Sequence, residues 1–157
     1  MQPLNVHEII QFAVQIEKNG LDFYLDQKTK NSRPEIKKIF SELAEDEIRH
    51  AEIFQAMSDK IHACEPAESF PEDYFLYIKS FSDRLIFNSA QNRIQAGQIR
   101  HPAEALDFAC ARELEAIAYY QEIQKITGPE TRSAVEKIIS EERGHFLKLS
   151  AILKTLR

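Results

Sequence analysis

The sequence is poor in the residues that build turns. Only 4 glycines and 6 prolines occur among 157 residues. A β-rich fold needs many tight turns, which these residues supply, so their scarcity favours long helices. The longest unbroken apolar runs are five residues, Tyr74–Ile78 and Ala116–Tyr120, whereas a membrane-spanning helix needs about 20. We therefore expect an all-α protein of globular composition with no membrane partner.

Cysteine is also scarce, and the two cysteines exclude the common thiolate metal sites. Cys64 and Cys110 form no Cys-x-x-Cys pair, which excludes a rubredoxin-type iron site and a zinc finger. The net charge of −5 comes without a basic stripe, so nucleic acid is not an expected partner. No basic residue precedes Lys18, and no apolar stretch of signal-peptide length lies near it. The expected location is therefore the cytoplasm.

Start and stop signals divide most of the chain into four long helices. Each start has a proline in the first turn or an N-cap side chain, and most have a glutamate nearby. In chain order the signals are Asn5 with Glu8, Ser32 with Pro34 and Glu35, Pro102 with Glu104, and Gly128 with Pro129. They predict helices over about 6–28, 33–63, 102–127 and 129–156.

The segment between the second and third of these helices, about 64–101, is predicted to be a long crossover. Apolar residues recur at helical spacing within it and predict a short amphipathic helix: Tyr74, Phe75, Ile78, Phe81 and Leu85. The other two connections are short, which makes antiparallel hairpins. We therefore predict one domain over 1–157, a four-helix bundle of two antiparallel hairpins. The sequence leaves open whether the crossover helix covers the bundle or forms a dimer contact.

The two predicted hairpins repeat each other in sequence. Shifts of 96 and 95 residues place Phe12 on Phe108, Ala13 on Ala109, Glu17 on Glu113, Phe23-Tyr24 on Tyr119-Tyr120, and Glu47-x-x-His50 on Glu142-x-x-His145. The repeated unit is a helical hairpin and not a short solenoid repeat.

Each of the four helices carries acidic residues within an otherwise apolar stripe. The stripes alternate spacings of three and four, which indicates a helix face turned toward a core. Their polar members are Glu17, Glu47, His50, Glu113, Glu142 and His145. No lysine or arginine lies on these stripes, so ion pairs cannot neutralise the four buried carboxylates. Two divalent cations would balance them, and mixed carboxylate and imidazole ligands suit iron, manganese or zinc.

This pattern resembles the di-metal carboxylate site of ferritin-like bundles. There, one glutamate from each of two helices joins Glu-x-x-His from each of the other two. The surrounding residues are similar to the rubrerythrin branch, over about 6–60 and 102–156. The marks are Glu17 with Phe23-Tyr24, Phe40-x-x-Leu43-Ala44-x-x-Glu47-x-x-His50, Ala109-x-x-x-Glu113 with Tyr119-Tyr120, and Glu142-x-x-His145. Two positions depart from rubrerythrins proper, since Ala116 and His145 both stand where that branch tends to carry glutamate. The ligand set is therefore closer to the symmetric one of bacterioferritin.

The resemblance implies a site for two iron ions, with Glu47 and Glu142 bridging both. The remaining ligands would divide as Glu17 with His50 on one ion and Glu113 with His145 on the other. It also implies an oxidoreductase that reacts Fe(II) with O2 or H2O2, served by an external electron donor protein. Two alternatives remain open, a ferroxidase that handles iron and a non-enzymatic bundle that binds zinc or nothing. A homodimer is the expected assembly.

Several residues near the predicted ligands have two interpretations. Tyr24 and Tyr120 could hydrogen-bond ligand carboxylates or serve only as core aromatics. Asp46 and Glu141 are expected to be exposed charges, with orientation of the imidazoles as the alternative. Cys110 is expected to be a small core residue. Small neighbours leave room for ions: Ala13, Gly20, Ala109 and Ala116.

Overall fold

The computed structural model describes residues 5–63 and 71–157, with the side chains of these residues except 62, 63 and 86–96. Every regular element in this part of the chain is a helix. The helices are α1 Val6–Lys30, α2 Pro34–Ala63, α3 Glu72–Gln98, α4 Pro102–Ile126 and α5 Pro129–Thr155. The predicted all-α class is confirmed.

The ends of the four predicted helices agree with the structure to within two residues. At the start of α1, the Asn5 side chain accepts from the Glu8 N–H at 2.9 Å, and the Glu8 carboxylate accepts from the Asn5 N–H at 2.9 Å. The predicted cap at Ser32 is wrong, because α2 begins at Pro34 and its first turn bonds to the carbonyl of Arg33. Proline prefers the first helical position, which leaves the residue directly before it as the cap.

The crossover helix α3 is longer than the sequence predicted. It spans 27 residues, as many as α5, so the expectation of a short helix is wrong. No glycine or proline lies between Pro71 and Gly97, so nothing in this stretch interrupts a helix once it has begun. The helical spacing of Tyr74 to Leu85 therefore identified only its first half.

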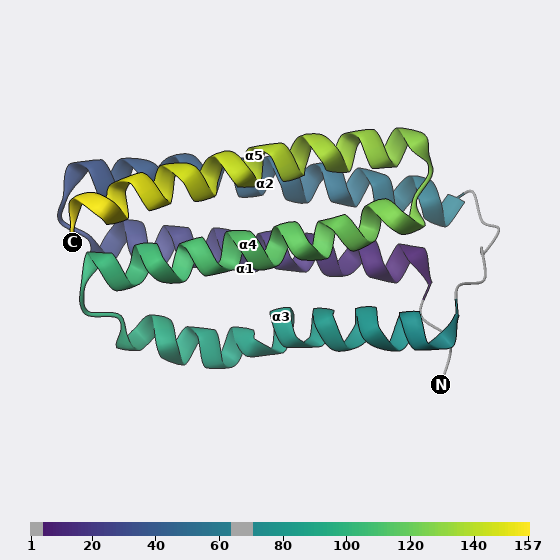
Figure 1. The fold of residues 1–157 in the computed structure, drawn as a ribbon, viewed down its shortest axis with the longest axis horizontal. Coiled ribbons are helices and arrows are strands. Elements are labelled where there is room, and N and C mark those ends of the chain that lie inside the picture. Colours follow the sequence, from purple (N-terminus) through teal and green to yellow (C-terminus); the bar gives the residue numbers. More distant parts are fainter. Residues whose placement is uncertain (1–4, 64–70) are drawn as a thin grey trace.

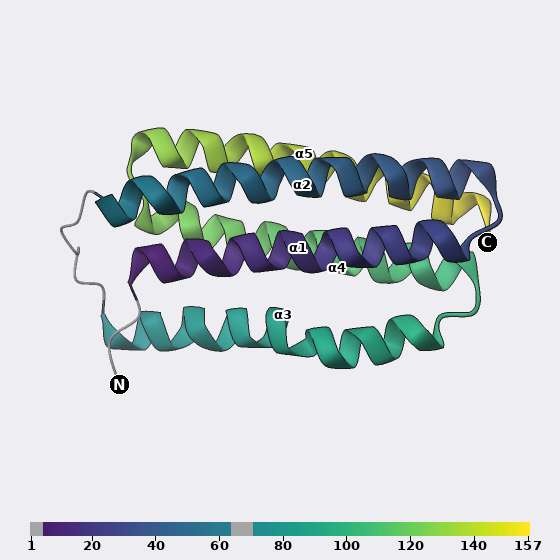
Figure 2. The same cartoon turned by 180° about the vertical axis from the view of Figure 1, so that it is seen from behind.

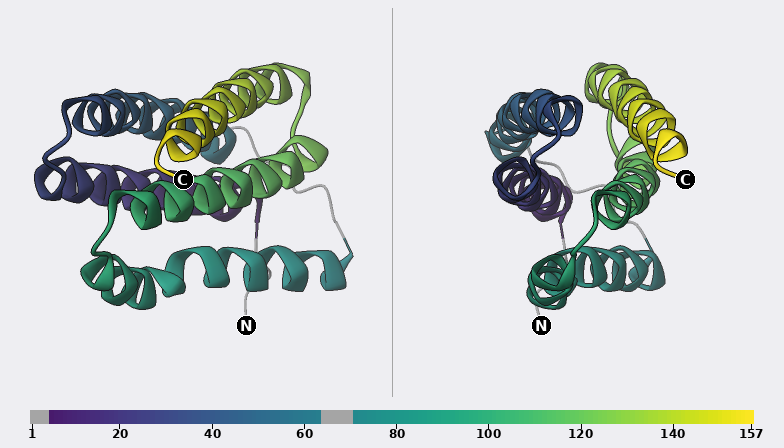
Figure 3. Two further views of the ribbon diagram at one scale, coloured as in Figure 1. Left: turned by 60° about the vertical axis from the view of Figure 1, so that its left-hand side comes forward. Right: turned by 90° about the vertical axis from the view of Figure 1, so that its left-hand side faces the viewer.

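The helices form two antiparallel hairpins, α1–α2 and α4–α5, packed against each other (Figure 1). The view from behind shows α1 and α2 in front of the other pair (Figure 2). Seen along the bundle, α3 lies outside the four helices, beside α1 and α4 (Figure 3). Tyr74 of α3 donates to the carboxylate of Glu122 at 2.9 Å, and the Phe81 ring lies 5.5 Å from that of Tyr119. The crossover helix thus covers one side of the bundle.

Two apolar clusters form the core, one toward each end of the bundle. One contains Ile10, Phe54 and Ile138, and the other contains Phe40, Leu106 and Leu149. The buried glutamates and histidines occupy the layer between them. This arrangement follows from the sequence, where each polar residue interrupts an apolar stripe near its middle.

The described helices contain no stretch of sufficient length and hydrophobicity to traverse a lipid bilayer.

Candidate metal centre

All six predicted ligands meet in the middle of the bundle. Glu17 comes from α1 and Glu113 from α4, while α2 and α5 each supply a glutamate and a histidine one turn apart. Each of the six side chains is buried, with at most 5% of the residue surface exposed. Both residues of a Glu-x-x-His pair face the same way because positions three apart lie on one face of a helix.

The ligand atoms form two overlapping groups. One group contains Glu17, Glu47, His50 and Glu142, and the other contains Glu113, Glu142 and His145, with the atoms of each group within 4.8 Å of one another. Glu142 belongs to both groups. Its two oxygens lie 3.0 Å from His50 Nδ1 and 2.8 Å from His145 Nδ1. The geometry therefore suits two neighbouring ions that share the Glu142 carboxylate.

Glu47 provides a direct test of whether these residues fit a metal. Its Oε2 atom is buried and has no hydrogen-bond partner, and it lies 3.8 Å from His50 Nδ1. A buried carboxylate oxygen without a partner costs free energy, so it needs a cation or a proton. The orphaned oxygen and the surrounding carboxylates and imidazoles together fit a divalent transition metal.

Gly20 makes room for the Glu47 side chain. A Cβ atom on Gly20 would lie 3.0 Å from Glu47 Oε1 and 3.3 Å from its Cδ. Such contacts are tight, so any larger residue would displace the carboxylate. The sequence placed Gly20 among the small neighbours of the site, and the structure identifies Glu47 as the group it accommodates.

Burial and mutual repulsion keep protons on two of the carboxyl groups in the absence of metal. Burial raises the pKa of Glu47 well above its usual range, and the charges of Glu17 and Glu142 raise it further. Burial also raises the pKa of Glu142 to about 8, with added repulsion from Glu17 and Glu113. Both groups would give up protons when cations replace them.

Hydrogen bonds to the neighbouring carboxylates keep protons on the two histidines, although burial alone would remove them. Burial alone would lower the pKa of His145, but hydrogen bonds to Glu113 and Glu142 raise it to about 10. Burial opposes a charge on His50 as well, yet hydrogen bonds to Glu142, Glu17 and Glu47 raise its pKa strongly. Without metal the cluster is therefore balanced by protons shared between imidazoles and carboxyl groups.

Two tyrosines bridge the hairpins at the depth of the site. The hydroxyl of Tyr24 on α1 donates to Glu113 on α4, and that of Tyr120 on α4 donates to Glu17 on α1. Both tyrosines are almost completely buried. The two tyrosine hydroxyls therefore hydrogen-bond carboxylates of the predicted ligand set, as one of the two interpretations expected. The crossed arrangement follows the internal repeat, in which Glu17 corresponds to Glu113 and Tyr24 to Tyr120.

Asp46 and Glu141 orient the imidazoles, contrary to the expectation of free surface charges. His145 Nε2 lies 3.0 Å from Asp46 Oδ2, and His50 Nε2 lies 2.7 Å from Glu141 Oε2. Each carboxylate reaches the histidine of the other helix. With Nε2 held in this way, the Nδ1 atom of each ring is directed at the ligand cluster.

Arg49 joins these two outer carboxylates, a role that the sequence interpretation missed. Its Nη2 atom lies 2.7 Å from Asp46 Oδ1 and 2.7 Å from Glu141 Oε2. Its position three residues after Asp46 was a signal for the first contact. The contact with Glu141 crosses between helices and depends on how α2 and α5 pack.

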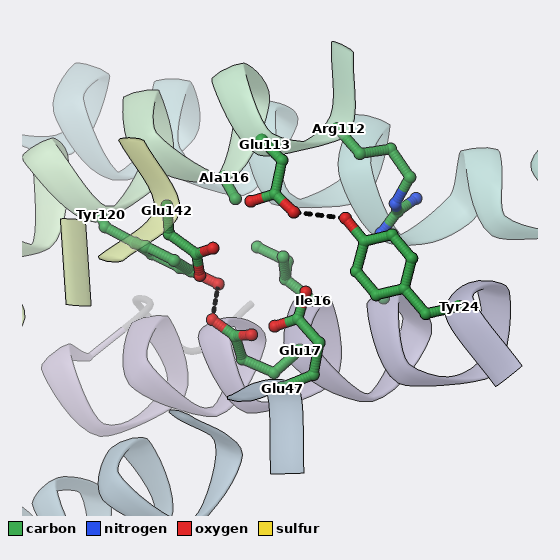
Figure 4. A pocket seen from close by; sticks show the side chains of 10 residues that line it. Ile16, Glu17, Tyr24, Glu47, Arg112, Glu113, Ala116, Tyr120 and Glu142 are labelled. Carbon is green, nitrogen blue, oxygen red and sulfur yellow. Dashed lines mark hydrogen bonds between the residues drawn. The ribbon is translucent and has the colours of Figure 1, made fainter. Parts of the chain in front are cut away.

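A cavity of about 20 Å³ lies between α1 and α4 beside the ligands (Figure 4). The four glutamates of the cluster, both bridging tyrosines and Arg112 line it. A single water molecule needs roughly 10–15 Å³ of such space, so the cavity admits only a molecule of a few heavy atoms. Arg112 was also missed at the sequence level, because it lies off the apolar stripe of its helix.

Cys110 agrees with the expectation of a small core residue. It is 8% exposed, and its Sγ lies 3.6 Å from the Ser150 hydroxyl. Burial raises the pKa of the Cys110 thiol, so it remains unreactive near neutral pH. Cys64 lies outside the described residues.

Comparison with known proteins supports this interpretation of the fold and the cluster. Residues 8–84, which include Glu17, Glu47 and His50, match the Rubrerythrin family. The solved structure of a protein from Thermotoga maritima, described as a candidate ferritin-like diiron-carboxylate protein, matches with a TM-score of 0.71 and 26% identity. The match covers 100% of this chain and 99% of that chain. No curated protein matches the sequence. Together, the two matches support assignment of the chain to the ferritin-like di-iron carboxylate superfamily.

Proposed function

We propose that the chain is a di-iron oxidoreductase of the rubrerythrin type. Two iron ions would be held by Glu17, Glu47, His50, Glu113, Glu142 and His145, with Glu47 and Glu142 as the bridging carboxylates. When bound, the two ferrous ions supply two electrons to reduce O2 or H2O2. The observation that carries the proposal is the sharing of Glu142 by two ligand groups, since one carboxylate between two imidazoles matches a dinuclear site better than two separate ones.

The side chains around the ligands perform tasks that such a reaction requires. The tyrosine hydroxyls hold Glu17 and Glu113 in place, and Asp46 and Glu141 hold the imidazoles. Nearly complete burial of the ligands keeps bulk water away from the metals. The small cavity limits the substrate to molecules of a few heavy atoms. These features favour reaction with a small oxidant over reaction with an organic substrate.

Two partners belong to the proposal. An external electron donor protein would return the iron ions to the ferrous state after each reaction with oxidant. A second copy of the chain would complete a homodimer, the common assembly for a protein of this kind.

Stopped-flow spectroscopy of the ferrous protein tests the proposed reaction. Anaerobic protein loaded with two equivalents of Fe(II) is mixed with O2 and, separately, with H2O2, and the absorption of ferric iron bound to the protein is followed. We expect fast oxidation with at least one oxidant. The double variant Glu47→Ala/His145→Ala should lack it, while Glu52→Ala, at an exposed position of α2, should react like wild type. An iron-loaded wild-type protein that neither oxidant converts to the ferric form would refute the proposal.

A further inference from the structure

Arg112 is the outermost residue of the central cavity. Nine of the ten residues that line the cavity are buried, and only Arg112 is half-buried. The cavity therefore meets solvent beside the Arg112 side chain. Figure 4 draws its guanidinium group at the same end of the cavity as the Tyr24 ring and the Tyr24–Glu113 hydrogen bond. A molecule that enters here passes Arg112 before it reaches the ligands.

The Arg112 guanidinium has no partner within the described part of the chain. It makes no hydrogen bond and no ion pair there, although Glu113 follows it directly. The Glu113 carboxylate is directed elsewhere, to the Tyr24 hydroxyl and toward His145 Nδ1 at 3.7 Å. An arginine carries five N–H donors in a planar arrangement suited to anionic oxygens. Arg112 is half-buried, and no side chain or carbonyl among the described residues uses these donors, so they are available to a ligand.

The internal repeat shows that this charge is a specific feature of one side of the entrance. With the shift of 96 residues Arg112 corresponds to Ile16, which lines the same cavity from α1. The other lining residues of α1 and α4 match in pairs of similar chemistry: Glu17 with Glu113, Gly20 with Ala116, and Tyr24 with Tyr120. The repeated scaffold therefore accounts for every lining position of these two helices except Arg112. A positive charge at the entrance attracts anions and repels metal cations.

We propose that Arg112 makes the cavity entrance a binding site for small anions and for small polar oxidants that accept hydrogen bonds, such as peroxide. The inference rests on the proposed function and names the substrate class of the same site. The size of the cavity excludes anions of more than a few heavy atoms. The charge of Arg112 disfavours Fe(II) as the molecule that travels through this opening, so the route serves the oxidant and not the metal.

The binding of azide, a linear anion of three atoms, tests the role of Arg112. Iron-loaded, oxidised protein is mixed with azide, and the association rate is followed by the absorption that azide produces on ferric iron. The variants are Arg112→Gln, Arg112→Glu and Arg112→Lys, with Arg33→Gln as control. Arg33 is exposed in the turn between α1 and α2, so the control loses the same charge at the end of the bundle.

We expect Arg112→Gln to slow azide association about tenfold and Arg112→Glu to slow it further, since a charge at a cleft entrance changes association rates by about 10- to 1,000-fold. Arg112→Lys and Arg33→Gln should stay within about twofold of wild type. Nitric oxide, which is neutral, should bind the ferrous form of all variants at similar rates. The iron content of each variant is measured first, so that a changed rate is not a loss of metal.

Three results would overturn the inference. They are a rate for Arg112→Gln within about twofold of wild type, an equal decrease in Arg33→Gln, and a failure of iron-loaded wild type to bind azide. Should Arg112→Gln lose its iron, the salt dependence of the wild-type rate decides. The rate of azide association should fall as the salt concentration rises from about 0.05 to 0.5 M. A constant rate would contradict the proposed role of Arg112. A wild-type protein that binds no iron would refute the proposed function itself, whereas normal oxidation with unchanged azide binding would refute only the role of Arg112.

Discussion

The hydroxyl of Tyr24 on α1 donates a hydrogen bond to the carboxylate of Glu113 on α4, so one hairpin holds a predicted metal ligand of the other. Tyr120 returns the same contact to Glu17. Each of these ligands thereby receives its support from across the hairpin interface. Docking of the two hairpins and assembly of the site are therefore a single event, since neither hairpin carries both a ligand glutamate of this kind and the tyrosine that holds it.

Replacing Tyr24 with phenylalanine should weaken metal binding without unfolding the protein. The change removes the hydroxyl that orients Glu113, and loss of such a supporting contact typically lowers metal affinity about 10- to 100-fold. Competition with a chelator measures the affinity. Tyr119→Phe is the matched control, because the buried Tyr119 hydroxyl donates to the Ile9 carbonyl at 3.0 Å, away from the ligands. Both variants should lose about 1 kcal/mol of stability, but only Tyr24→Phe should lose affinity. An equal loss of affinity in both would contradict the role of Tyr24.

Alanine at Gly20 should lower metal affinity, whereas alanine at Gly144 should raise the stability of the fold. At Gly20 the added Cβ would lie 3.0 Å from Glu47 Oε1, which forces the carboxylate to move. Metal affinity should fall in this variant. At Gly144 a Cβ would meet nothing within 4 Å, so alanine should stabilise α5 by about 1 kcal/mol through its higher helix propensity. Thermal unfolding and metal titration of the pair measure both effects, and unchanged affinity in Gly20→Ala would show that Glu47 is not confined there.

The metal-free protein should lose stability as pH rises above about 6.5. The folded state raises the pKa of His145 from 6.5 to about 10 and that of Glu142 from 4.5 to about 8. Between the unfolded and folded pKa values the folded state holds the extra proton, so unfolding releases it and rising pH favours unfolding. The windows overlap from pH 6.5 to 8, and each group contributes on the order of 1 kcal/mol per pH unit there.

Chemical denaturation of chelator-treated protein at pH 6.5, 7.2 and 8.0 measures this slope. Metal-loaded protein is the control, because ions replace the protons and should remove most of the dependence. For the same reason metal affinity should increase over this pH range. A metal-free protein whose stability rises with pH would show that the cluster is not balanced by protons.

Replacing Arg49 should change metal affinity more than it changes the stability of the fold. Its side chain is 46% exposed, and exposed ion pairs contribute about 1 kcal/mol or less to stability. Arg49→Gln should therefore unfold almost as wild type does. Its metal affinity should fall several-fold, because Asp46 and Glu141 lose the group that holds both of them behind the histidines. Arg143→Gln, which removes a 3.5 Å contact with Glu136 on the same face of α5, should leave affinity unchanged.

The residues of the buried cluster could be predicted from the sequence because each helix carries its own evidence. A glutamate within an apolar stripe points into the core whatever the neighbouring helices do. Each of the four glutamates lies near the middle of its own helix: Glu17, Glu47, Glu113 and Glu142. The prolines at 34, 102 and 129 likewise mark helix starts by local geometry alone. Both kinds of signal depend on positions close together in the chain.

The partners of the supporting contacts between helices could not be predicted, because they depend on how the helices rotate against each other. Asp46 lies four residues before His50, so its own helix suggested that histidine as its partner. Instead it bonds His145 on α5. The contact between Arg49 and Glu141 also depends on how two helices pack. The position of Arg112 at the cavity edge likewise follows from the spacing of α1 and α4. The length of α3 was missed because the apolar pattern that identified it ends at Leu85, although the sequence contains no helix breaker before Gly97.

The most direct test of a dinuclear centre is the number of metal ions that each chain binds. Metal-free wild-type protein is titrated anaerobically with Fe(II), together with the double variant Glu47→Ala/His145→Ala and the control Glu52→Ala. We predict two tightly bound ions per chain in wild type and control, and loss of both in the double variant. Wild-type protein that binds one ion or none, or a double variant that still binds two, would contradict the central claim.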